Sequence, residues 1–218
     1  MFITFAAERH IGWQLPNMNL TLYCWEKKIL PIVPFFIKNI KSIYRSYRLV
    51  WTFFCQSIIA GIPLRGCVSS GFALMDSNKS IYFGTPLVEA ARGEPARKAI
   101  GISFGKSFNN HHPVYNDYFI PFWDFIKTDD PKSKFISPMV LDWSRYWRIS
   151  PDFKDFSFAD CIKKMNTNPD FSEYYDNAIS FFNFSNGHEN WYEEINRDGI
   201  SDIIDYYKKT EEWFKSVT

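Results

Sequence analysis

Histidine, cysteine and carboxylate side chains are those most able to do chemistry, and this sequence sets few of them at a useful spacing. Its only adjacent histidines are His111 and His112, in a segment rich in Asn and Pro. Adjacent imidazoles on a loop can bind a metal, but a third ligand is needed and none is evident nearby. We therefore favour an exposed polar loop over a metal site. Glycine-rich phosphate loops and the motifs of metalloproteases and serine hydrolases are absent from the sequence.

Two further positions carry charges that need a partner. Asp142 and Arg145 flank Trp143 and Ser144 at the end of an apolar run, which indicates an ion pair near a strand end. A structural role for that pair is favoured over a functional one. Arg65 stands alone in an apolar stretch, and its guanidinium must reach a counter-charge or a ligand. An ion pair with an acidic residue of the C-terminal half is one alternative for Arg65, and a bound ligand is the other.

The charge is distributed unevenly, although 25 Lys and Arg nearly balance 24 Asp and Glu. Residues 27–75 contain no acidic side chain. The basic side chains of this segment are Lys27, Lys28, Lys38, Lys41, Arg45, Arg48 and Arg65. A solvated helix face explains them most simply, and a surface for nucleotide phosphates, nucleic acid or an acidic subunit is the alternative. The pI of about 7.6 argues against nucleic acid.

Composition indicates a folded protein of the cytoplasm. Aromatic residues make up 19% of the 218 residues, too many for a disordered chain. The four cysteines form no CxxC pair, so reduced thiols are expected. The N-terminus lacks the basic region of a signal peptide, and charged residues interrupt every long apolar stretch. We therefore expect a cytoplasmic protein that does not enter a membrane.

The expected elements describe an α+β protein. Apolar residues at steps of three and four predict a helix over 34–60, ended by Gly61 and Pro63. Runs at 20–25, 99–104 and 135–143 predict strands, and runs at 64–75 and 80–83 predict a hairpin. Further helices are expected at 87–92, 157–166, 170–184 and 201–217, with a loop-rich segment at 105–135. Residues 1–150 are thus predicted to form a mainly antiparallel sheet with covering helices, and 151–218 a helical C-terminal extension packed on it.

Five segments, taken in order, resemble the class III nucleotidyl cyclases, and most closely the bacterial pyrimidine cyclases of the Pycsar anti-phage system. They are GIPLRGCVSSG at 61–71, IYFGTPLVEA at 81–90, IGIS at 100–103, SPMVLDW at 137–143 and YYDNAISF at 174–181. The resemblance covers roughly residues 18 to 195. It implies a long helix leading into the GIPLRG strand, then a hairpin, and then a turn into a short helix.

The resemblance also implies an activity and its requirements. A pyrimidine nucleoside triphosphate would be converted to a 3′,5′-cyclic nucleotide and pyrophosphate in anti-phage signalling, with two Mg²⁺ or Mn²⁺ ions. Such cyclases act as head-to-tail homodimers with the site at the interface. Arg65 would contact the base or a phosphate, because its strand lines the nucleotide pocket in that family. Arg92 aligns with the arginine that purine cyclases use on the transition state, whereas Val88 replaces their asparagine.

The sequence departs from the family at the metal ligands. The family places two aspartates early in the domain, but only Glu8 and Glu26 precede Asp76 here. Asn19 stands about where the second aspartate belongs, and the first metal strand is not evident before Gly61. Three alternatives follow: a catalytic strand encoded upstream, a degenerate cyclase that acts as a nucleotide-binding or regulatory partner of an intact one, or a metal held by Glu8 or by a partner's carboxylate. A structural or interaction module that uses the basic helix is a further alternative.

Overall fold

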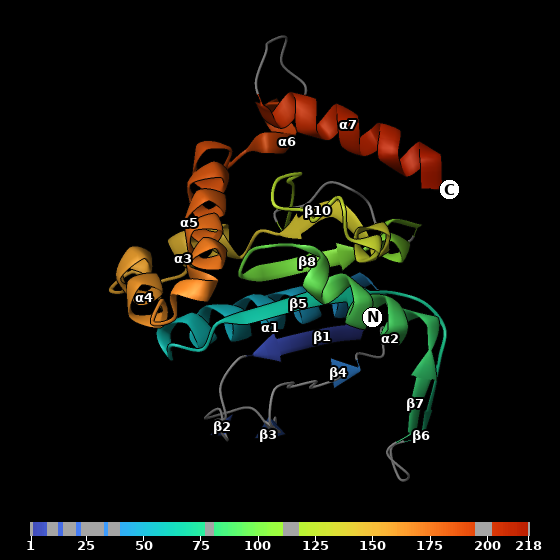
Figure 1. Ribbon diagram of the computed structural model, residues 1–218, viewed down its shortest axis with the longest axis horizontal. Helices are drawn as coiled ribbons and strands as arrows, with labels where there is room; N and C mark the ends of the chain where they lie inside the picture. The colour runs from blue at the N-terminus through green and yellow to red at the C-terminus, as the bar shows by residue number, and fades with distance from the viewer. Residues whose placement is uncertain are drawn as a thin grey trace.

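A six-stranded mixed sheet forms the centre of the structure, a computed structural model that describes residues 2–7, 13–14, 21–22, 33–34, 40–76, 81–110, 118–194 and 202–217. Its strands in spatial order are β4 (Val33–Pro34), β1 (Phe2–Ala7), β5 (Leu64–Ser69), β8 (Gly101–Gly105), β10 (Ile136–Leu141) and β9 (Phe119–Pro121) (Figure 1). Only β5 and β8 are parallel, and the other neighbours are antiparallel. The α+β class is confirmed, and the sheet, which was expected to be mainly antiparallel, is mixed because its central pair β5 and β8 is parallel.

Strand β5 is covered on both faces. Leu64 and Val68 join the main core with helix α1 (Ile40–Ile59), whereas Cys67 packs with Ala90 of helix α2 (Thr85–Gly93) in a second cluster. Side chains alternate between the faces of a strand, so Arg65 shares the α2 face with Cys67. Figure 1 accordingly shows α2 in front of the sheet and α1 behind it.

Helix α1 confirms the predicted helical period. Tyr47, Trp51, Phe54 and Ile58 lie three or four positions apart and are buried against the sheet. The helix begins at Ile40 and not at Pro34, because Pro34 instead belongs to β4, where it pairs with Phe2 of β1. It ends as predicted before Gly61, whose φ of 74° lies in the region that favours glycine.

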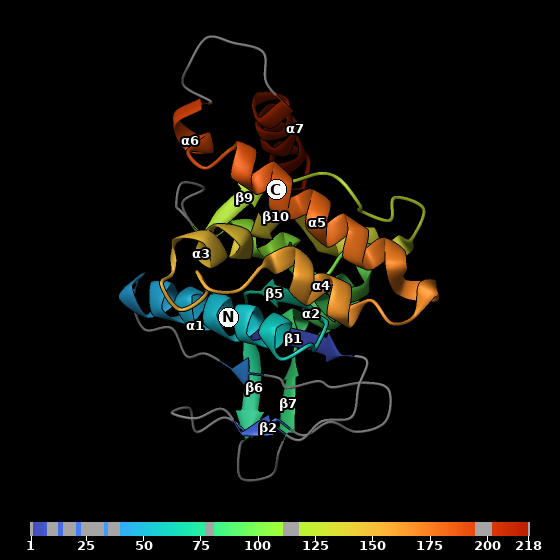
Figure 2. The same ribbon diagram turned by 90° about the vertical axis from the view of Figure 1, so that its left-hand side faces the viewer.

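The predicted hairpin forms, but its position differs from the expectation. Its strands are β6 (Ala73–Asp76) and β7 (Ile81–Gly84), which pair only with each other among the described residues and form a separate two-stranded sheet. The first part of the predicted run at 64–75 is β5 of the main sheet. In Figures 1 and 2 the ribbon of β6 and β7 projects away from the six-stranded sheet.

The C-terminal helices pack on the same core as the sheet. The Trp143 ring lies 5.1 Å from that of Phe54 on α1 and 5.5 Å from that of Phe181 on α5, measured between centroids. The division at residue 150 stays a prediction. The helices are α3 (Trp143–Ile149), α4 (Phe158–Met165), α5 (Ser172–Gly187), α6 (Trp191–Glu194) and α7 (Asp202–Val217). Short 3₁₀ helices are η1 (Glu94–Ala96), η2 (Lys106–Asn110), η3 (Pro131–Phe135) and η4 (Pro169–Phe171).

Several elements differ from the sequence predictions. Strand β1 was not expected. The predicted strand at 20–25 is described only at Thr21–Leu22 (β3), which pairs with Trp13–Gln14 (β2). The expected loop at 105–135 contains η2, β9 and η3, and the strand at 135–143 ends at Leu141, because Trp143 begins α3.

The described residues bear on two expectations, the state of the cysteines and the presence of a membrane-spanning helix. The three cysteines that the structure describes, Cys55, Cys67 and Cys161, are free thiols. None of the described helices combines the length and hydropathy needed to cross a membrane.

The close packing of α2 on β5 predicts that Gly93 tolerates no side chain. A Cβ atom there would lie 2.6 Å from Cys67 Sγ and 2.8 Å from Ile136 Cγ2. We expect Gly93→Ala to lower the free energy of unfolding by about 1–3 kcal/mol, measured by urea denaturation. Gly187→Ala is the control, since nothing lies within 4 Å of its added Cβ. Equal effects of the two substitutions would contradict the described packing.

Candidate functional site

Arg65 occupies the α2 face of β5 and is held by two neighbours. Its Nη2 lies 3.0 Å from Glu94 Oε1 in η1, and its guanidinium carbon lies 5.0 Å from the ring centroid of Tyr174 on α5. The ion-pair alternative therefore describes this structure, although the partner precedes the C-terminal half in which it was expected. The ion pair joins β5 to η1, and the contact with Tyr174 joins β5 to α5.

Arg92 lies in the last turn of α2, and its side chain is exposed. Its guanidinium carbon is 5.0 Å from the ring centroid of Phe135, and Lys134 Nζ is 5.4 Å from the same centroid. Arg65 and Arg92 thus have different neighbours. Of the two arginines that the resemblance assigns to nucleotide binding, Arg92 is the more accessible, and Val88 on the same helix is also exposed.

Glu89 faces inward from α2. Its Oε1 accepts a hydrogen bond of 2.8 Å from the backbone N–H of Ser107, and a Cβ on Gly105 would lie 2.1 Å from that oxygen. Burial raises the pKa of Glu89, and the hydrogen bonds from Ser107 oppose that rise. The sequence did not reveal this residue, because a glutamate in an Ala-rich helix is typical of a solvated position.

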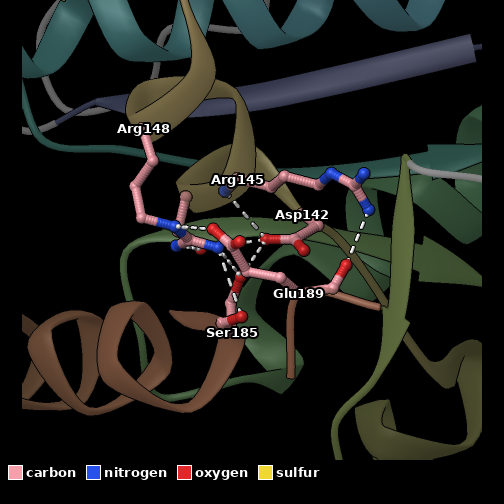
Figure 3. A network of polar contacts seen from close by, with 6 residues as sticks. Asp142, Arg145, Arg148, Ser185 and Glu189 are labelled. Carbon is pink, nitrogen blue, oxygen red and sulfur yellow. Dashed lines mark hydrogen bonds and ion pairs between the residues drawn. The ribbon is translucent and has the colours of Figure 1, made fainter. Parts of the chain in front are cut away.

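Asp142 is the centre of a buried polar network (Figure 3). It caps the N-terminus of α3, and its Oδ1 accepts hydrogen bonds from Ser144 Oγ at 2.9 Å, Ser185 Oγ at 2.6 Å and the Arg145 backbone N–H at 3.1 Å. Burial raises the pKa of Asp142, while these hydrogen bonds and the charge of Arg148 lower it.

The network extends to Arg148 and Glu189. Arg148 donates to Ser144 Oγ and to Ser185 Oγ, at 3.2 Å each, and its Nε lies 3.0 Å from Glu189 Oε1. The predicted ion pair between Asp142 and Arg145 is therefore wrong, because the arginine whose charge acts on Asp142 is Arg148. Arg145 gives Asp142 its backbone N–H, while its guanidinium donates to the Glu189 carbonyl at 2.8 Å. The network fixes α3 to α5, which is a structural role.

The described residues do not fit the pair of metal ions that the resemblance implies. Glu89, Glu94 and Asp142 each bind protein groups on different elements, and β1 and β5 carry no carboxylate. Within the described ranges, no three His, Cys, Asp or Glu side chains gather as metal ligands. Glu8, Asn19 and the histidine pair at 111–112 lie outside the described residues.

A group of exposed apolar side chains marks the projecting ribbon of β6 and β7. Phe72, Leu74 and Phe83 are 96%, 69% and 73% exposed. Leu74 is directly opposite Phe83 in the ladder, so these two share one face, and Phe72 immediately precedes β6. We call these three residues the hairpin face. Sequence reasoning placed the hairpin but did not show that this face lies outside the core.

Comparison with known proteins identifies no relative. The chain matches no protein-family model, no curated protein and no solved structure. The cyclase resemblance therefore stays a prediction from the sequence.

The buried carboxyl of Asp142 predicts a pH dependence of stability. Its raised pKa means that the folded state holds the proton more tightly than the unfolded chain. The contribution of the neutral carboxyl is complete below the unfolded-state pKa and is lost as the pH rises through the folded-state pKa. We therefore expect the free energy of unfolding of the wild type, relative to Asp142→Asn, to fall over that range in urea titrations.

Ser180→Ala on the exposed surface of α5 is the control for this titration. Its stability relative to the wild type is expected to be independent of pH, because neither side chain titrates. A difference between the wild type and Asp142→Asn that stays constant from acid to neutral pH would contradict the assigned burial of the carboxyl.

Proposed function

We propose that this chain is a nucleotidyl cyclase-like partner protein that pairs with a second copy of itself through the hairpin face and does not cyclise a nucleotide alone. The order of elements supports the cyclase-like part of the proposal. Helix α1 leads into β5, the hairpin follows, and α2 then leads to β8 beside β5. The resemblance implies the same order for the long helix, the GIPLRG strand, the hairpin and the short helix.

The hairpin face is the single observation that carries the pairing. A two-stranded ribbon is marginally stable in water, and here it presents large apolar side chains to the solvent. Each strand also has one edge that no described strand covers. Exposed apolar patches of this kind mark interaction surfaces, since covering them removes apolar area from water.

The low charge of the hairpin favours a second copy as the occupant of the hairpin face. Residues 69–75 and 83–88 contain no charged side chain, and β6 ends at a single carboxylate, Asp76, so a partner of opposite charge has little to bind. The net charge of +1 opposes self-association only weakly. A two-fold pair would bring the same face of both copies together, which suits an apolar surface that complements itself.

The carboxylates support a role in binding without turnover. Glu89, Glu94 and Asp142 are engaged by Ser107, Arg65 and two serines respectively. Because their oxygens already bind protein groups, they are poor candidates to hold divalent cations among phosphates. We assign the contact with a nucleotide phosphate to Arg92, because Arg65 already has a counter-charge and Arg92 lies at the surface beside Lys134.

The pairing predicts the assembly state of variants. We expect the wild type to sediment as a dimer and Phe72→Ser/Phe83→Ser to sediment as a monomer, because the substitutions replace apolar contact area with hydroxyls. Ile149→Ser is the matched control, since Ile149 is 59% exposed on α3 and lies outside the hairpin. A monomeric wild type would contradict self-pairing. If the chain forms a complex only with an intact cyclase, then that cyclase, and not a second copy, is the partner that binds the hairpin face.

The proposed lack of turnover is tested with each of the four ribonucleoside triphosphates and Mn²⁺. We expect no cyclic product, and nucleotide binding that Arg92→Ala weakens about tenfold in calorimetry, equal to about 1.4 kcal/mol. Lys163→Ala on exposed α4 is the control and should bind as the wild type does. Cyclic product from the isolated wild type would overturn the partner-protein role in favour of an active cyclase.

A further inference from the structure

A small internal cavity lies where β8 meets η1 and the C-terminal helices. It leaves about 10 Å³ for the centre of a water-sized molecule, which is about the least that holds one water. Apolar side chains such as Ile102 and Phe181 form much of its wall, and Glu94, Arg97 and Trp143 bring polar groups to it. A molecule of this size is held there only if it hydrogen-bonds to those groups.

Two of these polar groups are hydrogen-bond donors. The Arg97 Nε donates to Ser103 Oγ at 3.4 Å and its Nη1 to the backbone carbonyl of Asp124, whereas its buried Nη2 meets no acceptor among the described residues. The indole Nε1 of Trp143 is also buried, and no acceptor for it lies in the described part of the chain. A Cβ added to Gly101, which lines the cavity, would lie 3.3 Å from this nitrogen. The cavity thus has two N–H groups that need an acceptor.

Glu94 brings an acceptor to the same cavity. Its Oε1 is buried and lies 3.0 Å from Arg65 Nη2. A carboxylate oxygen has two lone pairs, so Oε1 can accept another hydrogen bond beside this ion pair.

The charges around the cavity favour a neutral occupant. Burial lowers the pKa of Arg97 to about 9, and the negative charge of Asp124 opposes that fall. Arg97 therefore already has an opposite charge close by. The Glu94 carboxylate in the wall would repel a second anion, and the apolar part of the wall gives a cation no ligands. The lining thus suits a small neutral molecule that both accepts and donates hydrogen bonds.

We infer that the cavity binds one water molecule, which accepts hydrogen bonds from Arg97 Nη2 and Trp143 Nε1 and donates one to Glu94 Oε1. Three hydrogen bonds are typical of a buried water. The water connects the ion pair between Arg65 and Glu94 to the buried guanidinium of Arg97, so that one carboxylate serves both arginines. It also joins η1 to the first residue of α3.

Nuclear Overhauser transfer between water and the indole proton of Trp143 tests the site in the wild type. A water molecule held inside the protein tumbles with it and gives a transfer of the same sign as contacts within the protein. We expect this signal at Trp143. Trp191 is the matched control and should lack it, because its indole is also buried but donates to the Phe119 carbonyl at 2.8 Å. No signal at Trp143, or equal signals at the two indoles, would overturn the water site.

A double-mutant cycle measures the link between Trp143 and Glu94. Trp143→Phe removes the indole donor, and Glu94→Gln keeps the size of the side chain but removes its charge. We expect the joint effect on the unfolding equilibrium constant, measured in urea, to differ from the product of the separate effects by about fivefold. Trp191→Phe with Glu94→Gln is the control and should show independent effects, since Trp191 does not line the cavity. Independent effects of Trp143→Phe and Glu94→Gln would contradict the bridge.

A crystal structure of the wild type gives a readout that does not depend on any variant. The expected result is one water within hydrogen-bond distance of Arg97 Nη2, Trp143 Nε1 and Glu94 Oε1. An empty cavity, an ion at that position, or a direct hydrogen bond from Arg97 Nη2 or Trp143 Nε1 to Glu94 would overturn the inference.

Discussion

The burial of β5 on both faces constrains the rest of the structure. One face of this strand meets the aromatic residues of α1, and the other meets α2 and η1. A charged side chain on such a strand needs a partner from the covering layer, and Arg65 finds Glu94 there. The hairpin that precedes α2 forms its own two-stranded sheet outside the six-stranded one. The apolar residues of that hairpin thereby become a surface.

The parts of the molecule that hold the fold together differ from those proposed to bind a partner in how completely their groups are engaged within the chain. The Asp142 network is closed, because serines and a backbone N–H serve its carboxylate and Arg148 faces Glu189 (Figure 3). The hairpin face, in contrast, is left exposed by the described residues. The proposed partner binds there, and the proposed nucleotide contact is Arg92 at the surface, not a buried carboxylate.

Local signals in the sequence predicted much of the secondary structure. The three-and-four spacing gave α1, and the polar turn between apolar runs gave the hairpin. Short strands such as β9 have too few residues to show alternation, and β1 is defined by pairing with β5, far along the chain. The site contacts were equally non-local: Asp142 and Ser185 are 43 residues apart. No local spacing distinguishes Arg145 from Arg148 as the neighbour of that carboxylate.

The central claim is that a second copy of the chain covers the hairpin face. Hydrogen exchange of the amides in β6 and β7, followed over a range of protein concentrations, tests it most directly. If a second copy covers the hairpin face, these amides exchange more slowly as the concentration rises, while those of the doubly covered β5 do not change. Exchange of β6 and β7 at one rate over all concentrations would contradict it.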